Sequence, residues 1–321
     1  MTEATATSQE GARASLAVRL WAYQSERFPV FRHGLLIAAF GASAVCLSAL
    51  LRDAAPNPLA ILVAVLVLFG FFFQLRVADE HKDNEDDTKY RPERPVPRGL
   101  VTLGELRAIA IGVGVIQLAL TAWLGQGLIA FVLLVWAWMA VMTKEFFVPK
   151  WLKARPVIYM ASHMLIMPLI DLYATACDWQ PADVALHQGF GLTLGAFLLL
   201  SLVNGSAIEI ARKSWAPDME REGVETYSKL WGAGRAGVVV MVIVLAGFAL
   251  AAFINVRSAA GFWMLGGLAL VTAWTAWCAI DYAGTPTRTT AKMLETASGV
   301  FVLANYLLLG VIPLLLSLVP A

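Results

Sequence analysis

Long apolar stretches, each able to cross a lipid bilayer as a helix, dominate this 321-residue sequence. A helix needs about 20 mostly apolar residues to span roughly 30 Å of hydrocarbon. Nine stretches meet this requirement: Val30–Leu51, Pro58–Val77, Val101–Leu124, Gly127–Thr143, Val157–Ala176, Gly189–Ile210, Ala233–Val256, Ala259–Tyr282 and Thr296–Val319. Unpaired backbone groups are costly in lipid, and none of these stretches alternates as barrel strands do. We therefore expect an all-α integral membrane bundle.

The composition agrees with this class of protein. Hydrophobic residues make up 59% of the chain and charged residues 15%, whereas about a quarter of the residues in soluble domains are charged. The net charge of +1 gives no reason to expect a nucleic-acid partner. Cys46, Cys177 and Cys278 lie far apart without the spacing of metal ligands, so we expect them to be structural.

Lysine and arginine are concentrated on one side of the expected membrane. Of the 24, 22 fall in the N-terminal segment and in alternate loops, which leaves Arg52 and Arg257 on the other side. Cytoplasmic loops accumulate these residues. We therefore expect a cytoplasmic N-terminus and an outside C-terminus, as in a multi-pass protein of the bacterial inner membrane. Residues 1–29 are expected to be a cytoplasmic segment with an interfacial helix at about residues 15–28, and residues 30–321 a single nine-span domain.

The loop after the second span begins with a group of carboxylates, in the stretch DEHKDNEDDTKYRPERPVPRG. Asp79, Asp83 and Asp87 are four residues apart, so they form one stripe if the helix continues, and Glu80 lies beside it. Like charges at this spacing repel each other. Oxygen ligands without His or Cys suit Mg²⁺, which usually binds a few carboxylates together with phosphate oxygens of a substrate. The stripe therefore indicates a magnesium site for a diphosphate.

Basic residues and prolines follow directly: Lys89, Arg91, Arg94 and Arg98 alternate with Pro92, Pro95 and Pro97. The prolines stiffen the segment, and arginine forks match phosphate oxygens. A charge-balanced solvated loop is the alternative, since residues 76–99 contain seven acids and six bases. The stripe, the stiff segment and the position at the membrane edge together favour a phosphate site.

This stretch resembles the first motif of the UbiA superfamily of intramembrane prenyltransferases. That motif reads N-D-x-x-D-x-x-x-D, followed in the chlorophyll-synthase-like branch by P-x-R-P-x-P-S-G. The matching positions here are Asp79, Glu80, Asp83, Asp87, Pro92, Arg94, Pro95, Pro97 and Gly99. Asp79 and Glu80 replace Asn and Asp but keep oxygen ligands, and Arg98 replaces a small residue. The resemblance implies nine helices around a central, lipid-accessible cavity that is capped by cytoplasmic loops.

The second acidic motif of that family, D-x-x-D-x-x-x-D-x-x-x-G-x-x-T, is altered in this chain. The sequence after the sixth span reads EIARKSWAPDMEREGVETYSKLWG, with Glu209 in place of the first aspartate. Arg212 and Lys213 stand where acids are expected. Either one Mg²⁺ lies between Glu209 and the first stripe, or Glu220 and Glu222 supply oxygens while the two cations hold diphosphate directly. A surface pair between Glu209 and Lys213 is the third interpretation.

Two further positions are candidates. The family places a Tyr-x-x-x-Lys element between the fourth and fifth spans, and this chain has no such motif there. Lys144 is the nearest substitute, although it is as well explained as a snorkelling charge at a helix end. His163 lies within the fifth span, where ionisable residues are expensive and usually functional. It either binds the acceptor or acts as a general base, or it is a buried histidine bonded to a neighbouring helix.

The resemblance implies an enzyme that uses one or two Mg²⁺ ions to transfer an isoprenyl group from an isoprenyl diphosphate to a lipophilic acceptor in membrane lipid, through an allylic carbocation. The expected catalytic residues are Asp79, Asp83, Asp87, Glu209 and His163. The expected metal ligands are Asp79, Glu80, Asp83, Asp87, Glu209 and Glu220. The expected diphosphate ligands are Arg91, Arg94, Arg98, Lys144, Arg212 and Lys213.

Two other functions remain open. Some members of the superfamily are terpene cyclases, in which double bonds of the substrate itself capture the cation and no acceptor is needed. The altered second motif is compatible with that reaction. A non-catalytic carrier of polyprenyl lipid is the third possibility, and the carboxylates of the first motif argue against it.

Overall fold

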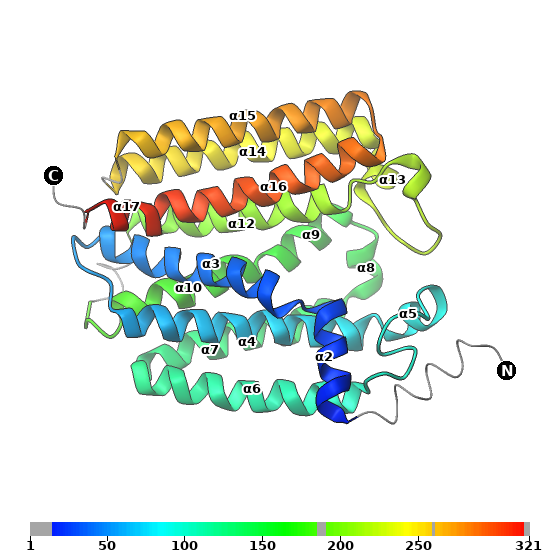
Figure 1. Ribbon diagram of the computed structural model, residues 1–321, viewed down its shortest axis with the longest axis horizontal. Helices are drawn as coiled ribbons and strands as arrows, with labels where there is room; N and C mark the ends of the chain where they lie inside the picture. The colour runs from blue at the N-terminus through cyan, green and yellow to red at the C-terminus, as the bar shows by residue number, and fades with distance from the viewer. Residues whose placement is uncertain (1–14, 185–190, 259–260, 318–321) are drawn as a thin grey trace.

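The computed structural model describes residues 15–184, 191–258 and 261–317. Within these ranges nine helical spans have mean hydropathies between 1.5 and 2.9, which confirms the expected number. They are α3 (Val30–Leu50), α4 (Pro58–Lys82), α6 (Leu103–Leu124), η1 with α7 (Gln126–Leu128, Ile129–Thr143), α9 with α10 (Pro156–Met164, Ile166–Trp179), α12 (Leu192–Arg212), α14 (Ala233–Arg257), α15 (Phe262–Gly284) and α16 with α17 (Arg288–Leu309, Val311–Ser317). Figure 1 shows these helices side by side, with their long axes roughly aligned.

Local signals start and interrupt the helices. The Asn57 side chain accepts a hydrogen bond from the Leu59 backbone N–H and caps α4. Thr102 and Glu105 form a capping box at the start of α6. The fifth span is divided into α9 and α10 at Leu165. Pro168 explains the division, because it has no N–H to donate to the carbonyl four residues earlier.

Helices extend past the lipid at the polar ends of two spans. The second span continues to Lys82, beyond the expected end at Val77, and the ninth begins at Arg288, before the expected Thr296. Hydropathy marks only the part of a helix that contacts lipid, whereas backbone hydrogen bonds carry the helix further into water.

The bundle is closed because α16 packs against both α12 and α3. Polar side chains join these helices inside the bundle. Asn305 donates a 2.9 Å hydrogen bond from its amide to Asn204 Oδ1, and the Tyr306 hydroxyl donates to Asp171. Buried polar groups are stable when they are paired in this way. These contacts give Asp171 a structural role in the core.

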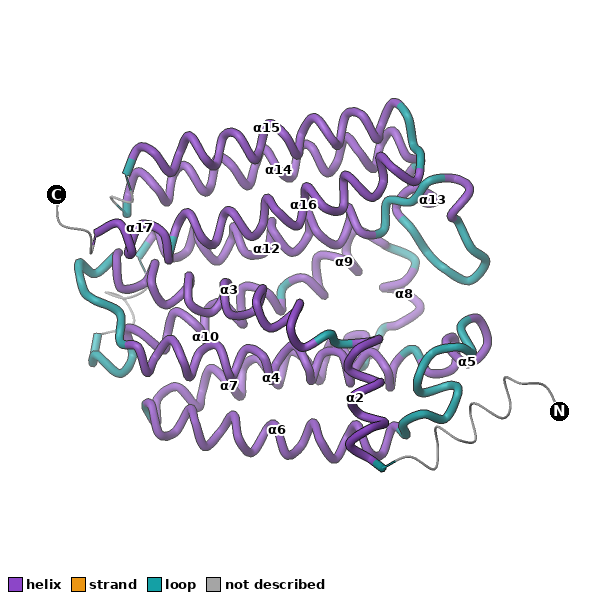
Figure 2. Tube along the Cα trace, viewed as in Figure 1, coloured by secondary structure: helices purple, strands orange, loops and turns teal. Residues whose placement is uncertain are grey.

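Short helices gather at one end of the bundle (Figures 1 and 2). They are α2 (Leu16–Arg27), α5 (Asn84–Tyr90), η2 (Glu145–Phe147), α8 (Pro149–Lys153), η3 (Pro217–Met219) and α13 (Tyr227–Trp231). The helix expected at about residues 15–28 is present as α2, which lies across the ends of the spans. Most of the charged loop residues that the structure describes are therefore at this end, which we call the loop end, whereas Arg52 and Asp178 form an ion pair at the other.

Candidate functional site

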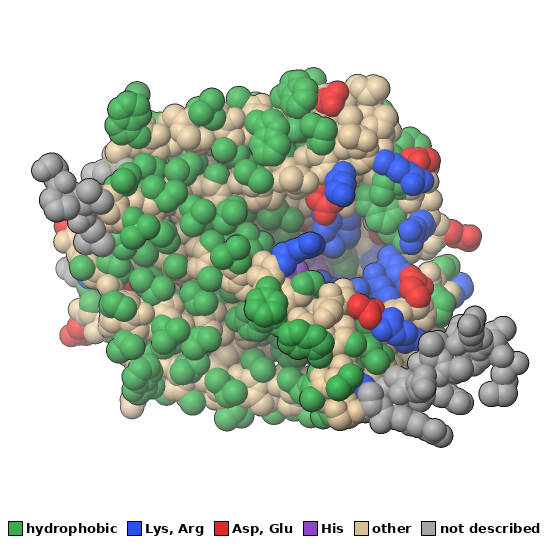
Figure 3. Space-filling view, in the orientation of Figure 1, with side chains coloured by type: hydrophobic (Ala, Val, Ile, Leu, Met, Phe, Trp, Pro, Cys, Tyr) green, Lys and Arg blue, Asp and Glu red, His purple; other side chains and the backbone are tan. Residues whose placement is uncertain are grey.

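A cavity of about 990 Å³ opens at the loop end. Its lining comes from α2, α4, α5, α7, α9, α10 and α12, from the loops after α5 and before α13, and from the first residues of α13 and α16. Figure 3 shows the opening as a hollow around which Lys and Arg side chains gather, with acidic side chains among them. As many basic as acidic side chains line it. The surrounding surface in this view is mostly hydrophobic, as a membrane protein requires.

Asp79 and Asp83 present carboxylates to the cavity from the end of α4. The helix ends at Lys82, but its hydrogen-bond ladder continues, because the Asp83 N–H donates to the Asp79 carbonyl and the Asp87 N–H donates to the Asp83 carbonyl. The only ion pair of Asp79 within the described residues is with Arg76, at 3.6 Å. Burial raises the pKa of Asp83 above its ordinary value, and Lys82 opposes this rise. A cation beside these carboxylates would therefore be stabilised.

The other carboxylates of the first motif are held by arginines. Asp87 is buried and accepts from Arg91 at 3.1 Å and from Arg94 at 2.5 Å. Glu80 is 1% exposed, accepts from Arg27 Nε at 2.6 Å, and is not part of the cavity lining. The expected assignment of Glu80 as a metal ligand therefore has no support from its position, since its carboxylate is directed at α2.

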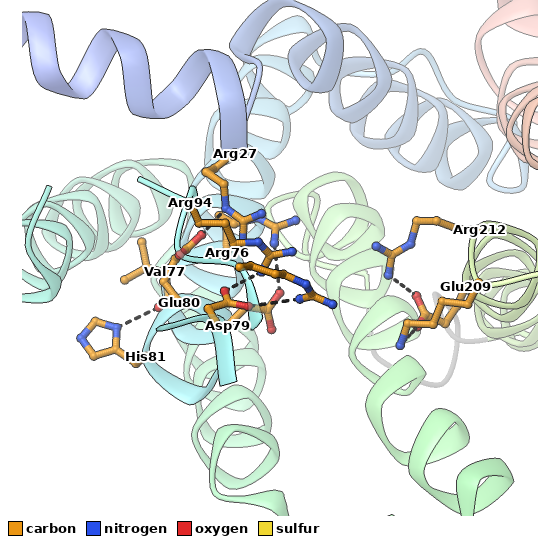
Figure 4. Close-up of polar contacts among 12 residues, drawn as sticks. Arg27, Arg76, Val77, Asp79, Glu80, His81, Arg94, Glu209 and Arg212 are labelled. Atoms are coloured by element: carbon orange, nitrogen blue, oxygen red, sulfur yellow. Dashed lines mark hydrogen bonds and ion pairs between the residues drawn. The ribbon is translucent and has the colours of Figure 1, made fainter. Parts of the chain in front are cut away.

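The altered second motif lies on the opposite side of the cavity. Glu209, at the end of α12, is 2.6 Å from Arg212 and 2.7 Å from Lys213 (Figure 4). Glu220 accepts hydrogen bonds of 2.7 Å from the hydroxyls of Thr226 and Ser228. Both acids line the cavity, but each is already satisfied by residues of its own segment.

One carboxylate pair in the lining fits a Mg²⁺ ion. Mg²⁺ is commonly held by one or two carboxylates together with substrate phosphates and water, and Asp79 with Asp83 provides such a pair. On the other side Glu209 is held by two cations. Within the described ranges, no group of three or more His, Cys, Asp or Glu residues is placed to hold a metal ion.

A cluster around Lys82 forms another wall. Lys82 Nζ donates to the Tyr159 hydroxyl and lies 3.1 Å from Glu145 and 3.5 Å from His163 Nε2. The Tyr159 and His163 rings stack with centroids 4.1 Å apart. Tyr159 and His163 have the four-residue spacing of the Tyr-x-x-x-Lys element that was expected in the preceding loop, and Lys82 supplies an ammonium group from α4.

Strained backbone positions this cluster. Glu145, Phe146 and Phe147 have φ values of 48°, 54° and 60° in the turn η2. Each non-glycine residue in this region costs about 1–3 kcal/mol and persists only where the surroundings require it. The turn directs the buried Glu145 carboxylate to Lys82 and places the Phe146 ring 6.0 Å from the His163 ring. Such strain is typical of functional sites.

The apolar part of the lining is rich in methionine. Met142 of α7, Met160 and Met164 of α9, and Met167 of α10 all contribute. Methionine side chains are flexible and polarisable, so they adapt to hydrocarbon ligands of irregular shape. The cavity thus joins a charged region to an apolar region at the edge of the membrane spans.

Two of the residues expected to bind diphosphate lie elsewhere. Arg98 is 2.6 Å from Glu26 of α2, and Lys144 is exposed, and neither lines the cavity. Arg91, Arg94, Arg212 and Lys213 do line it. Five further residues line the cavity that no sequence motif assigned to the site: Arg27, Arg76, Lys82, Tyr159 and Tyr227. The spacing of Tyr159 and His163 is the one signal that could have indicated part of this set.

The two loops that carry the motifs meet over the cavity. Gly223 has a φ of +73°, and a Cβ placed on it would lie 2.9 Å from the Tyr90 ring. Only glycine combines this backbone conformation with so close an approach. Gly223, in the G-x-x-T end of the second motif, thus allows the second loop to approach α5 closely.

Solved structures share this fold. A structure of digeranylgeranylglyceryl phosphate synthase in membranes is 17% identical over 92% of this chain and 99% of its own, with a TM-score of 0.63. The apo structure of a UbiA homolog from Aeropyrum pernix K1 is 15% identical over 88% of this chain and 98% of its own, with a TM-score of 0.65. No protein-family model and no curated protein matches the sequence. The UbiA fold expected from the first motif is confirmed.

Proposed function

We propose that this protein transfers an isoprenyl group from an isoprenyl diphosphate to a lipophilic acceptor within the membrane. The observation that carries the proposal is a single cavity in which carboxylates and cations lie next to a methionine-rich apolar lining. A diphosphate head and a hydrocarbon tail match these two regions. The fold supports the proposal, because a synthase of a geranylgeranylated lipid and a UbiA homolog share it.

The charged residues have separable tasks in this reaction. Asp79 and Asp83 would hold one Mg²⁺, which supplies Lewis acidity and neutralises charge on the diphosphate. Arg212 and Lys213 face the cavity from the other side and bind phosphate oxygens directly. The bond between the allylic carbon and the diphosphate oxygen breaks with its electron pair on the oxygen. The cations of the cavity stabilise that developing charge.

We propose that His163 takes up a proton when the acceptor captures the allylic cation. Its Nδ1 lies 2.8 Å from the Tyr159 backbone carbonyl, which assigns the ring proton to Nδ1 and leaves a lone pair on Nε2. Nε2 is directed to Lys82 at the cavity wall. The acceptor loses a proton as the new bond forms, and a neutral imidazole is a suitable base for it.

The test uses the full-length protein with labelled farnesyl or geranylgeranyl diphosphate, with and without Mg²⁺ and an aromatic acceptor. We expect release of diphosphate only when metal and acceptor are both present. Release without acceptor, together with a hydrocarbon product, would identify a cyclase instead. Binding without release would identify a carrier.

The variant Asp83→Asn tests the residue assignment. Turnover should fall by at least about a hundredfold, because the metal loses one of two carboxylate ligands. Asp183→Asn is the matched control, since Asp183 is an exposed aspartate far from the cavity lining. Turnover at the unaltered level in Asp83→Asn would remove the central assignment.

A further inference from the structure

The helix α2 reaches the cavity through its last residue, Arg27. Figure 1 shows α2 lying across the ends of the spans at the loop end. Arg27 lines the cavity together with Arg76 and Arg94. It precedes the first span and lies outside both acidic motifs, so the motifs give it no role.

One nitrogen of the Arg27 guanidinium has a hydrogen-bond partner, and the other two nitrogens are available to a ligand. Its Nε donates to Glu80 Oε1 at 2.6 Å. Within the described part of the chain, Nη1 and Nη2 have no hydrogen-bond partner, and the side chain is 15% exposed. Figure 4 shows Arg27, Arg76 and Arg94 on one side of the gap and Arg212 on the other. A guanidinium in this state offers the N–H groups of two nitrogens to an anion in the cavity.

The position of Arg27 is secured along the whole of α2. Arg19 is 2.5 Å from Glu105 at the start of α6, and Arg98 is 2.6 Å from Glu26. Tyr23 is 2% exposed and packs in a cluster with Val77, Val101 and Leu106. These contacts hold α2 against the first loop and α6, so the end of the helix is positioned rather than loosely attached.

The burial of Glu80 has an explanation in this arrangement. A buried ion pair is seldom more stable than apolar residues of similar size, so its presence calls for another role. The Glu80 carboxylate is directed away from the cavity and uses one oxygen to fix Arg27 Nε. It thereby orients the two remaining nitrogens, while an anion in the cavity would offset the repulsion among the neighbouring guanidinium groups.

We propose that Arg27 of α2 binds the diphosphate of the substrate and that Glu80 is the residue that positions it. The proposal rests on the proposed function, because it assigns a further ligand to the same diphosphate. In this proposal Glu80, the second acid of the first motif, binds an arginine and not a metal ion. The N-terminal helix then becomes part of the active site.

The experiment measures binding of inorganic pyrophosphate and of geranylgeranyl diphosphate to the full-length protein in the presence of Mg²⁺. Arg27→Gln should weaken both affinities by roughly tenfold to a hundredfold, since charge-assisted hydrogen bonds are lost. Arg32→Gln is the matched control, because Arg32 is an exposed arginine near Arg27 that does not line the cavity. Unchanged affinity in Arg27→Gln would overturn the proposal.

Glu80→Gln distinguishes positioning from metal binding. We expect Glu80→Gln to weaken pyrophosphate binding but to leave unchanged the Mg²⁺ concentration that gives half-maximal binding. When Arg27→Gln is already present, Glu80→Gln should weaken pyrophosphate binding no further. The double variant also avoids a lone buried carboxylate, so it remains informative if Arg27→Gln fails to fold. A raised Mg²⁺ requirement in Glu80→Gln alone would make Glu80 a metal ligand and contradict the proposal. If the unaltered protein binds neither probe, the proposed function itself is wrong.

Discussion

The carboxylates of the two acidic motifs differ in whether a basic side chain already neutralises them. Among the described residues Asp83 has no ion pair and Asp79 has only the 3.6 Å contact with Arg76, whereas Asp87 and Glu209 are each held by two cations. A carboxylate that is already paired with arginine gains less from a metal ion, because its charge is compensated. We therefore expect a metal ion to bind at the end of α4.

His163 provides the prediction at this scale. His163→Ala should lower kcat by roughly a hundredfold to ten-thousandfold while the affinity for isoprenyl diphosphate stays nearly constant, because a general base acts on the transition state. Steady-state kinetics and equilibrium binding measured on the same preparation check this split. Added imidazole should restore part of kcat.

The control for this prediction is His33→Ala, because His33 lies in α3 and does not line the cavity. A variant His163→Ala that loses diphosphate affinity while keeping kcat would show that the ring binds the substrate head and takes up no proton.

The sequence predicted those features of the site that lie along one helix. The spacing of Asp79, Asp83 and Asp87 predicted that they lie together, and all three line the cavity although α4 ends at Lys82 and α5 begins at Asn84. The pairing of Glu80 with Arg27 joins residues 53 positions apart, and no local pattern indicates it. The role of Lys82 could not be predicted for the same reason, because its partners Glu145 and Tyr159 lie more than 60 positions later, in η2 and α9.

At the scale of elements, hydropathy predicted which helices exist but not where they end. All nine spans were expected, yet α4 and α16 extend into water on polar residues. The contact of α2 with α6 through Arg19 and Glu105 could not be predicted from the sequence either, because it depends on how the two helices pack. No sequence pattern predicts the strained turn η2, because its positive-φ positions are occupied by residues other than glycine.

Close packing of α14 on α15 gives the prediction for elements. A Cβ at Gly237 would lie 2.6 Å from the Ala279 carbonyl oxygen and 2.8 Å from Ala283 Cβ. Gly237→Ala should therefore separate the two helices and lower stability by about 1–3 kcal/mol. The thermal unfolding midpoint of the purified protein measures this change.

Gly266→Ala is the control within the same pair of helices. Nothing lies within 4 Å of a Cβ at Gly266 in α15, so alanine should be neutral or add up to about 1 kcal/mol through helix propensity. If both variants unfold at the same temperature, α14 and α15 do not depend on this close approach.

At the scale of the whole molecule, the charged cavity lies at one end of an apolar bundle. The cavity has as many basic as acidic side chains, so a bound diphosphate would add negative charge that the lining alone does not offset. In the proposed reaction a divalent ion at Asp79 and Asp83 would offset this added charge on one side, while Arg212 and Lys213 of the lining would contact the phosphate from the other. The site is thus asymmetric across the bundle.

The distribution of Lys and Arg predicts that this end faces the cytoplasm. Single cysteines test it, because the native Cys46, Cys177 and Cys278 are all buried and should give little background. Ala55 lies in the exposed loop between α3 and α4 at the far end, and Glu222 is exposed at the loop end. Ala55→Cys should react with a membrane-impermeant maleimide in intact cells, whereas Glu222→Cys should react only after permeabilisation. The reverse pattern would place the cavity outside, where the substrate would have to be supplied from the opposite leaflet.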